Sequence, residues 1–538
     1  MSEPILDITG LSISYSSGPA RRNAVVHGVS LAVPARGVVA LVGESGSGKS
    51  TLAHSVARLL PPNARIDAGS IVLGGTDLTR TRESRMRAVR GKRIGFVPQD
   101  PMMSLNPTHR IGTQIAEAIR LHERCGNAEV SGRVRRLLLD AGFDAGSVDR
   151  AAAAFPHELS GGMLQRVLIA MACACGPELI IADEPTSALD VTVARRVLDH
   201  LQALVERNGC SLLIITHDLA LAARRSDRVA VMTRGRIVEC GPSDEVLGSP
   251  THPYTRGLVA SMPRARATGT VAGAPPPDAP ALLVVDRVTK TFDVPGRGEL
   301  TAVDDISFAI PTGGTFALVG ESGSGKSTTA RMALGLEEPT SGSITFDGQD
   351  IATLTRAGRR GLRRQTQVVY QNPYRSLDPR FTVEATIAEP LRAFGIGSRR
   401  EQRARVRDLL DRVGLPGQLA RRRPRELSGG QRQRVAIARA IAISPQLVVC
   451  DEPVSALDAS VQLQVLDLLT EIQRDLGVSY LFISHDLAVV RTIAHTVGVM
   501  RAGRLLEAGP VEQIFRAPAH EYTRELIEAS ATGAPVAT

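Results

Sequence analysis

The chain has 538 residues, of which 43% are hydrophobic and 22% charged, and its formal net charge is +9. The length predicts two or more domains, and the composition is that of a soluble globular protein. No apolar run approaches the roughly 18–20 residues that span a bilayer and no export leader is visible, so we expect a soluble cytoplasmic chain. The charge is spread thinly, which argues against nucleic acid as a partner. The six cysteines follow no zinc-site or disulfide pattern.

The two halves of the chain repeat one another. The phrase ALVGESGSGKST occurs at 40–51 and again at 317–328, and the blocks ELSGG, DEP, SALD and HDLA recur after it in the same order. We therefore predict two homologous domains, joined by a linker rich in Pro, Ala and Gly. The predicted boundaries are 1–262, 263–281 and 282–538.

Within each half, apolar runs of strand type alternate with helical patterns. Residues 37–43 are an example of the first kind, and residues 192–207 are an example of the second. This alternation predicts an α/β fold with a mostly parallel sheet.

The repeated phrase has the form G-x-x-x-x-G-K-[ST], follows an apolar strand and opens a helix. This is the context of a P-loop, in which backbone N–H groups and a helix N-terminus surround phosphates. The lysine should reach the β- and γ-phosphates, and the next serine should hold Mg²⁺. A glycine-rich turn without function would not explain two copies with the same flanks. The predicted nucleotide-binding residues are Gly43, Ser45, Gly46, Gly48, Lys49, Ser50 and Thr51 in the first copy, and Gly320, Ser322, Gly323, Gly325, Lys326, Ser327 and Thr328 in the second.

Further along each half come a glutamine and a Ser-Gly-Gly motif. Gln99 and Gln371 follow the strand-like runs FVP and VVY; each could bind Mg²⁺ and sense water, or could satisfy backbone groups of its loop. The Ser-Gly-Gly motif precedes a long helical pattern, so it predicts a helix N-terminus that can bind an anion. Its residues are Ser160, Gly161 and Gly162, and again Ser428, Gly429 and Gly430.

An Asp-Glu pair ends the apolar runs LIIADE and LVVCDE. Such a pair can also be a solvated helix start, but the preceding run is too apolar for the surface, so we expect the pair at the sheet edge beside the P-loop. Asp183 and Asp451 would bind Mg²⁺, and Glu184 and Glu452 would polarise the attacking water as general bases.

His217 and His485 each follow another apolar strand and precede an Asp. A lone histidine is more often structural than catalytic. Two copies at matching positions favour a contact with the γ-phosphate.

This set of motifs resembles the ATP-binding cassette ATPases over almost all of both halves. The resemblance implies two tandem P-loop NTPase domains, each with a mostly parallel sheet core, an antiparallel β subdomain and a helical subdomain that carries the Ser-Gly-Gly signature. It also implies an internal pseudo-dimer that binds ATP and Mg²⁺ between the P-loop of one domain and the signature of the other. Asp190 and Asp458 match the family's D-loops, and Tyr15 and Phe292 match an aromatic that stacks on adenine, although either ring could instead be core packing.

The two copies differ in one place that could matter. The first signature ends in Met163 where the second has Gln431, a change that would weaken one site. Both general-base glutamates are present, so we predict two hydrolysing sites.

Members of this family have different functions, so the fold alone does not identify the function. Neither half has the coiled coils or zinc-binding inserts of the DNA-maintenance members, and the linker lacks the charged arm of the translation and ribosome factors, which stay an alternative. The tails at about 241–262 and 509–530 contain HPYT and HEYT, similar to the dipeptide, oligopeptide and nickel import ATPases. We therefore expect the ATP-hydrolysing, energy-coupling subunit of an importer, with peptides as the first candidate cargo and nickel or another small solute as the alternative.

The resemblance also implies partners and a location. The expected partners are two transmembrane permease subunits and an extracytoplasmic solute-binding protein, with the chain at the cytoplasmic face of the membrane. Some members of the subfamily hold an iron–sulfur cluster beyond the tail. No cysteine lies between Cys240 and Cys450, so we predict no such cluster here.

Overall fold

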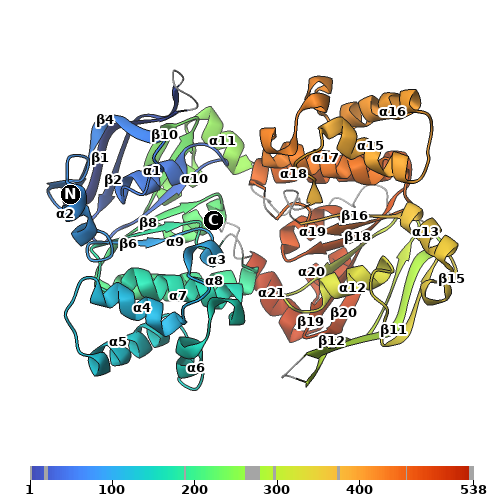
Figure 1. The fold of residues 1–538 in the computed structure, drawn as a ribbon, viewed down its shortest axis with the longest axis horizontal. Coiled ribbons are helices and arrows are strands. Elements are labelled where there is room, and N and C mark those ends of the chain that lie inside the picture. The colour runs from blue at the N-terminus through green and yellow to red at the C-terminus, as the bar shows by residue number, and fades with distance from the viewer. Residues whose placement is uncertain are drawn as a thin grey trace. The chain divides into compact units, whose positions relative to one another are not determined.

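The structure is a computed structural model that describes residues 3–16, 22–186, 189–260, 279–294, 298–371, 376–455 and 457–531. The described residues up to 260 form one compact unit, and those from 279 to 531 form a second. Both units contain the same succession of strands (Figure 1), and most helices correspond as well; where the first unit has an α-helix at Val148–Ala153, the second has a 3-10 helix at Gly417–Arg421. Of the predicted linker, residues 263–278 lie outside the described residues.

The first unit contains a six-stranded sheet with a parallel core. Its strand order is β10-β9-β3-β8-β7-β6, and only the β10–β9 pair is antiparallel. This confirms the mostly parallel sheet expected from the alternation of strands and helices. The strands are β3 (Val38–Val42), β6 (Ile94–Val97), β7 (Leu179–Asp183), β8 (Ser211–Thr216), β9 (Arg228–Thr233) and β10 (Arg236–Pro242).

A second, antiparallel sheet and a group of helices cover the parallel sheet. The antiparallel order is β2-β1-β4-β5, made of β1 (Pro4–Ser16), β2 (Arg22–Pro34), β4 (Ala64–Leu73) and β5 (Thr76–Asp77). Helices α4 to α7 lie on the side away from this sheet (Figure 1). The helices of the unit are α1 (Lys49–Val56), α2 (Glu83–Val89), α3 (Pro101–Ser104), α4 (Ile111–Arg120), α5 (Asn127–Asp140), α6 (Val148–Ala153), α7 (Gly161–Cys173), α8 (Val191–Asn208), α9 (Leu219–Arg225), α10 (Ser243–Gly248) and α11 (Pro253–Ala260).

Strand β3 shows how the sequence pattern builds these layers. Its side chains alternate between the two faces of the sheet. Val39 and Leu41 pack into the core shared with the antiparallel sheet, whereas Ala40 and Val42 pack with residues of α9, α10 and α11. All four are at most 1% exposed. The strand is therefore apolar throughout, as expected for a parallel strand covered on both faces.

The second unit repeats this architecture. Its parallel-core sheet has the order β16-β17-β18-β13-β19-β20 and its antiparallel sheet the order β12-β11-β14-β15. The strands are β11 (Ala281–Val294), β12 (Gly298–Pro311), β13 (Thr315–Val319), β14 (Ser341–Phe346), β15 (Gln349–Asp350), β16 (Thr366–Val369), β17 (Leu447–Asp451), β18 (Ser479–Ser484), β19 (Thr496–Arg501) and β20 (Arg504–Pro510). The helices are α12 (Lys326–Ala333), α13 (Arg356–Gln365), α15 (Val383–Ala393), α16 (Arg399–Arg412), α17 (Gly429–Ile441), α18 (Ala459–Leu476), α19 (Leu487–Ile493), α20 (Val511–Arg516) and α21 (Glu521–Ala531).

The helix after the first P-loop is shorter than its apolar pattern suggests. The pattern continues to Leu60, but α1 ends at Val56 and Arg58 adopts a left-handed φ of 51°. The sharp turn leads the chain toward β4. Among the described residues, no helix combines the length and the apolarity that crossing a membrane requires.

Candidate nucleotide-binding sites

The parallel strands bring the predicted site residues to one edge of each sheet. In the first unit the P-loop follows β3, Gln99 follows β6, Asp183 ends β7 and His217 follows β8. These four strands are consecutive neighbours, so their carboxyl ends meet at the edge where open α/β sheets bind ligands. In the second unit β13, β16, β17 and β18 place their counterparts in the same way: Gln371, Asp451 and His485.

Each P-loop takes a backbone path that requires glycine. Gly43 has a φ of 150° and Gly48 a φ of 104°. A Cβ atom at Gly43 would lie 2.0 Å from the carbonyl oxygen of Met232 on the neighbouring strand. At Gly320 the same atom would lie 2.1 Å from the carbonyl oxygen of Met500. The spacing of the motif therefore reflects close contact between the loop and the sheet.

The P-loop lysine folds back onto its own loop. Lys49 Nζ donates to the carbonyl oxygens of Gly43 (2.7 Å) and Glu44 (2.8 Å). Lys326 makes the same two bonds in the second unit, at 2.8 and 2.7 Å. Both lysines are nearly buried, with exposed fractions of 5% and 6%. The loop thus holds a desolvated cation that can exchange carbonyl oxygens for the oxygens of a phosphate.

Of the residues predicted to hold Mg²⁺, the serine and the aspartate are in contact in each unit. Ser50 Oγ donates to Asp183 Oδ1 over 3.1 Å, and Ser327 Oγ donates to Asp451 Oδ1 over 3.4 Å. Burial raises the pKa of both Asp side chains, so a nearby cation would stabilise their charged forms. In the part of the chain that the structure describes, no group of three or more His, Cys, Asp or Glu side chains could hold a metal alone. One hydroxyl and one carboxylate nevertheless fit Mg²⁺, which takes most of its ligands from phosphates and water.

The glutamate after each Asp is strained and held by two neighbours. Glu184 has a left-handed φ of 45°, which is uncommon for a residue with a Cβ atom. Its Oε2 accepts a hydrogen bond from Gln99 Nε2 at 2.7 Å, and its Oε1 lies 3.1 Å from His217 Nδ1. In the second unit Glu452 has a φ of 48°. Its Oε2 accepts from Gln371 Nε2 at 2.7 Å, and its Oε1 lies 3.1 Å from His485 Nδ1.

This pairing changes the acidity of both groups. Burial favours the neutral form of Glu184, but the hydrogen bond and charge of His217 outweigh it, so the pKa of Glu184 is lowered. Burial likewise opposes protonation of His217, but Glu184 outweighs it and raises the pKa of the imidazole. Glu452 and His485 shift in the same directions. A charged, firmly oriented carboxylate at this edge can accept a proton from water. The glutamines, predicted as Mg²⁺ ligands, contact this carboxylate.

The Ser-Gly-Gly motifs begin α7 and α17, as expected. Ser160 Oγ accepts a hydrogen bond from Met163 N at 3.4 Å. In the second unit Ser428 Oγ accepts from Gln431 N at 3.3 Å, and Gln431 Oε1 accepts from Ser428 N at 3.0 Å. This reciprocal capping box closes in the second unit alone, because methionine has no side-chain oxygen to return the bond.

The second glycine of each motif is packed against the next helix. A Cβ atom at Gly162 would lie 2.3 Å from Cγ1 of Val193 on α8, and a Cβ atom at Gly430 would lie 2.5 Å from Cγ1 of Val461 on α18. At Gly161 the nearest atom would be 3.6 Å away. Close helix packing thus explains why the second position is glycine.

Comparisons with known proteins agree with this arrangement. A family model described as "ABC transporter" matches residues 26–187 and 303–455. The chain belongs to the ABC transporter family. A second model, described as "Oligopeptide/dipeptide transporter, C-terminal region", matches 238–283 and 506–536. Each unit is therefore an ABC cassette, and the protein is an ATPase of this family.

Several relatives of this ABC protein match it over nearly its whole length. The oligopeptide transport ATP-binding protein OppD of Mycobacterium tuberculosis is 43% identical, covering 98% of this chain and 98% of that protein. The glutathione import ATP-binding protein GsiA of Salmonella choleraesuis is 42% identical, with coverages of 98% and 90%. The peptidoglycan transport ATP-binding protein YejF of Agrobacterium fabrum is 44% identical, with coverages of 98% and 97%.

The predicted adenine-stacking rings have different surroundings in the two cassettes. The hydroxyl of Tyr15 lies 3.1 Å from Oγ1 of Thr51 in the first turn of α1. Phe292 has no hydroxyl, and Lys290 Nζ lies 4.9 Å from the centroid of its ring, within the range of a cation–π contact. Tyr15 therefore lies beside the P-loop helix. Stacking of either ring on adenine stays a prediction.

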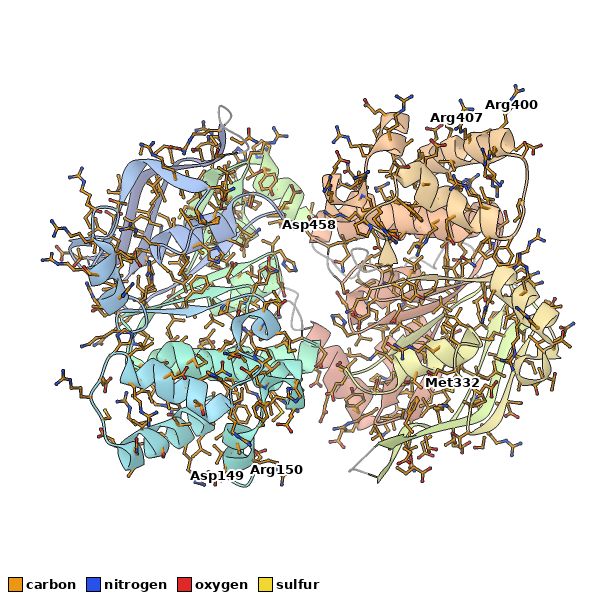
Figure 2. The ribbon with its side chains drawn as sticks, in the orientation of Figure 1. Asp149, Arg150, Met332, Arg400, Arg407 and Asp458 are labelled. Atoms are coloured by element: carbon orange, nitrogen blue, oxygen red, sulfur yellow. The ribbon has the colours of Figure 1, made fainter. Side chains whose placement is uncertain are left out.

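The two D-loop aspartates act as N-caps. Asp190 Oδ1 accepts a hydrogen bond from Val193 N at 2.9 Å, and Asp458 Oδ1 accepts from Val461 N at 3.0 Å. Asp458 lies at the N-terminal end of α18 (Figure 2). Within the SALD motifs, positions 187, 188 and 456 lie outside the described residues. A role for the two aspartates at the nucleotide also stays a prediction.

Sequence reasoning missed a contact from each tail to its P-loop. The hydroxyl of Tyr254, in the HPYT motif, accepts a hydrogen bond from Glu44 N at 3.2 Å. The hydroxyl of Tyr522, in the HEYT motif, accepts from Glu321 N at 3.3 Å. The repetition of the tyrosine at matching positions is the available signal in the sequence, but by itself it indicates only the subfamily.

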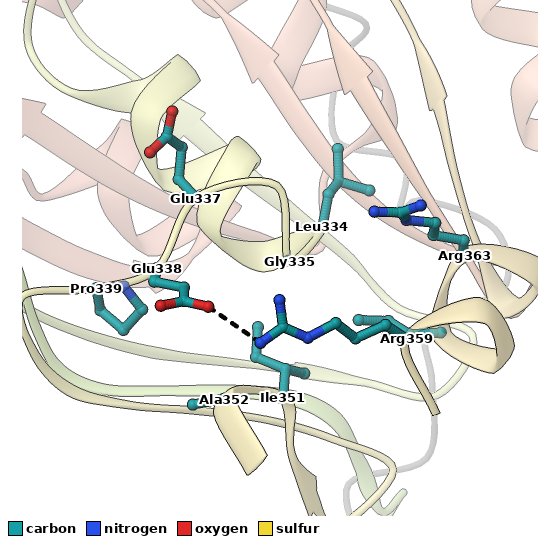
Figure 3. Close-up of a pocket in the computed structure, with 10 residues that line it drawn as sticks. Leu334, Gly335, Glu337, Glu338, Pro339, Ile351, Ala352, Arg359 and Arg363 are labelled. Carbon is teal, nitrogen blue, oxygen red and sulfur yellow. Dashed lines mark hydrogen bonds and ion pairs between the residues drawn. The ribbon is translucent and has the colours of Figure 1, made fainter. Parts of the chain in front are cut away.

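A small pocket in the second cassette lies apart from the predicted site. It is lined by residues of α13 and of the loop that follows α12, and Arg359 donates to Glu338 across it over 3.0 Å (Figure 3). None of its lining residues was predicted to bind nucleotide or metal. Chemistry is therefore assigned to the sheet edge rather than to this pocket.

Proposed function

We propose that this chain is the ATP-hydrolysing, energy-coupling subunit of a membrane importer for oligopeptides or dipeptides. The observation that carries the proposal is the pairing of two complete cassettes with two tail segments that match the oligopeptide/dipeptide transporter region. The names of the relatives, which cover oligopeptide, glutathione and peptidoglycan transport, support a peptide-like cargo.

Each cassette supplies the groups that phosphoryl transfer to water needs. Lys49 would exchange its carbonyl partners for oxygens of the β- and γ-phosphates, and Ser50 with Asp183 would hold Mg²⁺, which neutralises phosphate charge when bound. Glu184 would accept the proton of the attacking water, and His217 would orient Glu184 and contact the γ-phosphate. In the second cassette the same roles fall to Lys326, Ser327, Asp451, Glu452 and His485.

We propose further that the working unit is the pair of cassettes. The first P-loop would share its ATP with Ser428, Gly429 and Gly430, and the second would share its ATP with Ser160, Gly161 and Gly162. The serine-capped helix N-terminus in each cassette supports this proposal, because such an end favours negative charge.

The permease partners would dock near the glutamines. Met102 and Met103 in α3 follow Gln99 closely and are 54% and 84% exposed, an unusual exposure for methionine that suits a transient apolar contact. We propose that one permease subunit binds here and that the other binds near Gln371 in the second cassette. The chain would then sit at the cytoplasmic face of the membrane and serve a solute-binding protein on the far side.

Two measurements test the proposed function. Glu184→Gln and Glu452→Gln should each lower ATP turnover of their own site by about 10²–10⁴-fold, while ATP binding is kept. Affinity purification from detergent-solubilised membranes should recover two multi-span permeases. Recovery of ribosomes instead, or full ATPase activity in the double variant, would contradict the proposal.

A further inference from the structure

The tail of each cassette is built so that one tyrosine reaches the P-loop. His252 Nδ1 accepts a hydrogen bond from Tyr254 N at 3.1 Å, and His520 Nδ1 accepts from Tyr522 N at 3.1 Å. The histidine thereby caps the start of the tail helix and orients the tyrosine that follows it. The residue between them is Pro in one tail and Glu in the other, and the contacts are nevertheless the same.

A half-buried carboxylate fixes the segment that leads into this motif. Glu239 on β10 accepts hydrogen bonds from Thr251 N at 2.8 Å and from His252 N at 3.1 Å. Burial opposes its charge, but these hydrogen bonds outweigh burial and lower the pKa of Glu239 to about 2. Glu507 on β20 makes the same pair of bonds in the second cassette, at 2.8 and 3.2 Å. The tail is thus anchored to the edge strand of the sheet at both copies.

The tyrosine hydroxyl and the P-loop lysine hold opposite ends of one peptide unit. In the peptide that joins Gly43 to Glu44, the N–H donates to the hydroxyl of Tyr254, and the carbonyl oxygen accepts from Lys49 Nζ. In the peptide that joins Gly320 to Glu321, the N–H donates to Tyr522 and the carbonyl accepts from Lys326 Nζ. Hydrogen bonds at the two ends of a peptide polarise each other and fix the orientation of its plane.

This peptide follows a glycine, whose backbone is not restricted by a Cβ atom. Gly43 and Gly320 both have a φ of 150°, a region open to glycine because it lacks a Cβ atom. A glycine leaves the adjoining peptide free to rotate unless a partner holds it. The tyrosine hydroxyl supplies that partner from outside the loop.

We propose that Tyr254 and Tyr522 are positioning residues for nucleotide binding, which hold the first peptide of each P-loop so that its lysine meets the phosphates. The inference rests on the proposed role of the P-loops as ATP sites. It assigns a function to the HPYT and HEYT tails within this chain: each tail completes the P-loop of its own cassette. In this proposal the tyrosines act on the loop, through Glu44 N and Glu321 N, and not through a contact with ATP.

The test removes one hydroxyl and measures binding at one site. Tyr254→Phe is made in a Lys326→Ala background, so that binding of a fluorescent ATP analogue reports the first cassette. We expect the Kd to rise about threefold to tenfold, the effect of one lost hydrogen bond. Tyr522→Phe in a Lys49→Ala background should behave alike.

Tyr480→Phe is the matched control. The hydroxyl of Tyr480 donates to Leu469 O at 2.9 Å in the core of the second cassette, far along the chain from any P-loop. Its loss should lower the melting temperature without changing the Kd for the ATP analogue. A Tyr522→Phe variant that shows this same pattern would overturn the proposal, because the tyrosine would then be merely structural.

A second variant tests the proposal without changing the tyrosine side chain. Glu239→Gln weakens the anchor of the tail and should also raise the Kd, but it should add little in a Tyr254→Phe background if both act through one contact. Full additivity would contradict the proposal. If Lys49→Ala in the Lys326→Ala background leaves binding of the ATP analogue intact, the assignment of the ATP site itself fails, an outcome distinct from an unchanged Kd in Tyr254→Phe alone.

Discussion

Gly162→Ala should destabilise the first cassette through a single contact. The added Cβ atom would lie 2.3 Å from Cγ1 of Val193, about 1 Å inside ordinary van der Waals distance. Valine in a helix has one strongly preferred rotamer, so the side chain cannot easily turn away. Overpacking of this kind costs about 1–3 kcal/mol, and the gain from alanine over glycine in a helix offsets up to about 1 kcal/mol. We expect a net loss of about 0.5–2 kcal/mol.

The assay must resolve one cassette from the other. Urea-dependent hydrogen exchange, followed on peptides from α7 and α8, reports the local free energy of opening without assuming that two similar units unfold together. Gly161→Ala is the control, since its Cβ would meet nothing closer than 3.6 Å, and it should leave stability unchanged or slightly higher. Val193→Ala should remove most of the penalty in the double variant. Equal exchange in the two alanine variants, or no rescue by Val193→Ala, would refute the packing argument.

Three further predictions follow from the site. Met163→Gln should close the missing capping box and raise the free energy of opening of the first turn of α7, measured by hydrogen exchange, by about 0.5–1 kcal/mol. Unchanged exchange would show that the restored bond adds no stability to this turn. The His217–Glu184 pair should stabilise the fold most between roughly pH 4.3 and 6.5. This stabilisation should be lost as the pH falls through the lowered pKa of Glu184 and as it rises through the raised pKa of His217. His217→Ala should flatten the dependence of unfolding free energy on pH in this range, and an identical dependence would count against the pairing. Ser50→Ala, made in a Glu452→Gln background so that turnover reports the first site, should raise the Mg²⁺ concentration for half-maximal ATP turnover by about tenfold, the equivalent of about 1.4 kcal/mol. No change would remove Ser50 from the metal site.

The sequence predicted the sheet edge well because its signals are local and repeated. Four apolar strands of the parallel core each end in, or are followed by, a recognisable motif or polar residue, and parallel pairing brings such ends together. The antiparallel sheet came from the family resemblance, because β1 and β4 are far apart in sequence and their register depends on tertiary packing.

Other features needed side-chain positions. The bond between Gln99 and Glu184 joins residues on separate strands, so no spacing rule gives it. Tyr254 and Glu44 are separated by most of the sequence of the first cassette. Only the folded chain shows that the tyrosine hydroxyl contacts the backbone N–H of Glu44. The left-handed φ of Glu184 was also invisible, since glutamate carries no preference for that region.

The left-handed glutamates have a consequence for attempts to make this protein more heat-resistant. A residue with a side chain held in that region costs about 1–3 kcal/mol, and glycine would relieve the cost at once. At a pH above the raised pKa of His217 and His485, where the pairs with the glutamates no longer add stability, Glu184→Gly and Glu452→Gly should therefore be recovered by selections that reward survival at high temperature alone, and we expect these variants not to turn over ATP. A screen for durable transporters has to demand growth on the imported nutrient in the same round, or it will converge on well-folded but idle subunits.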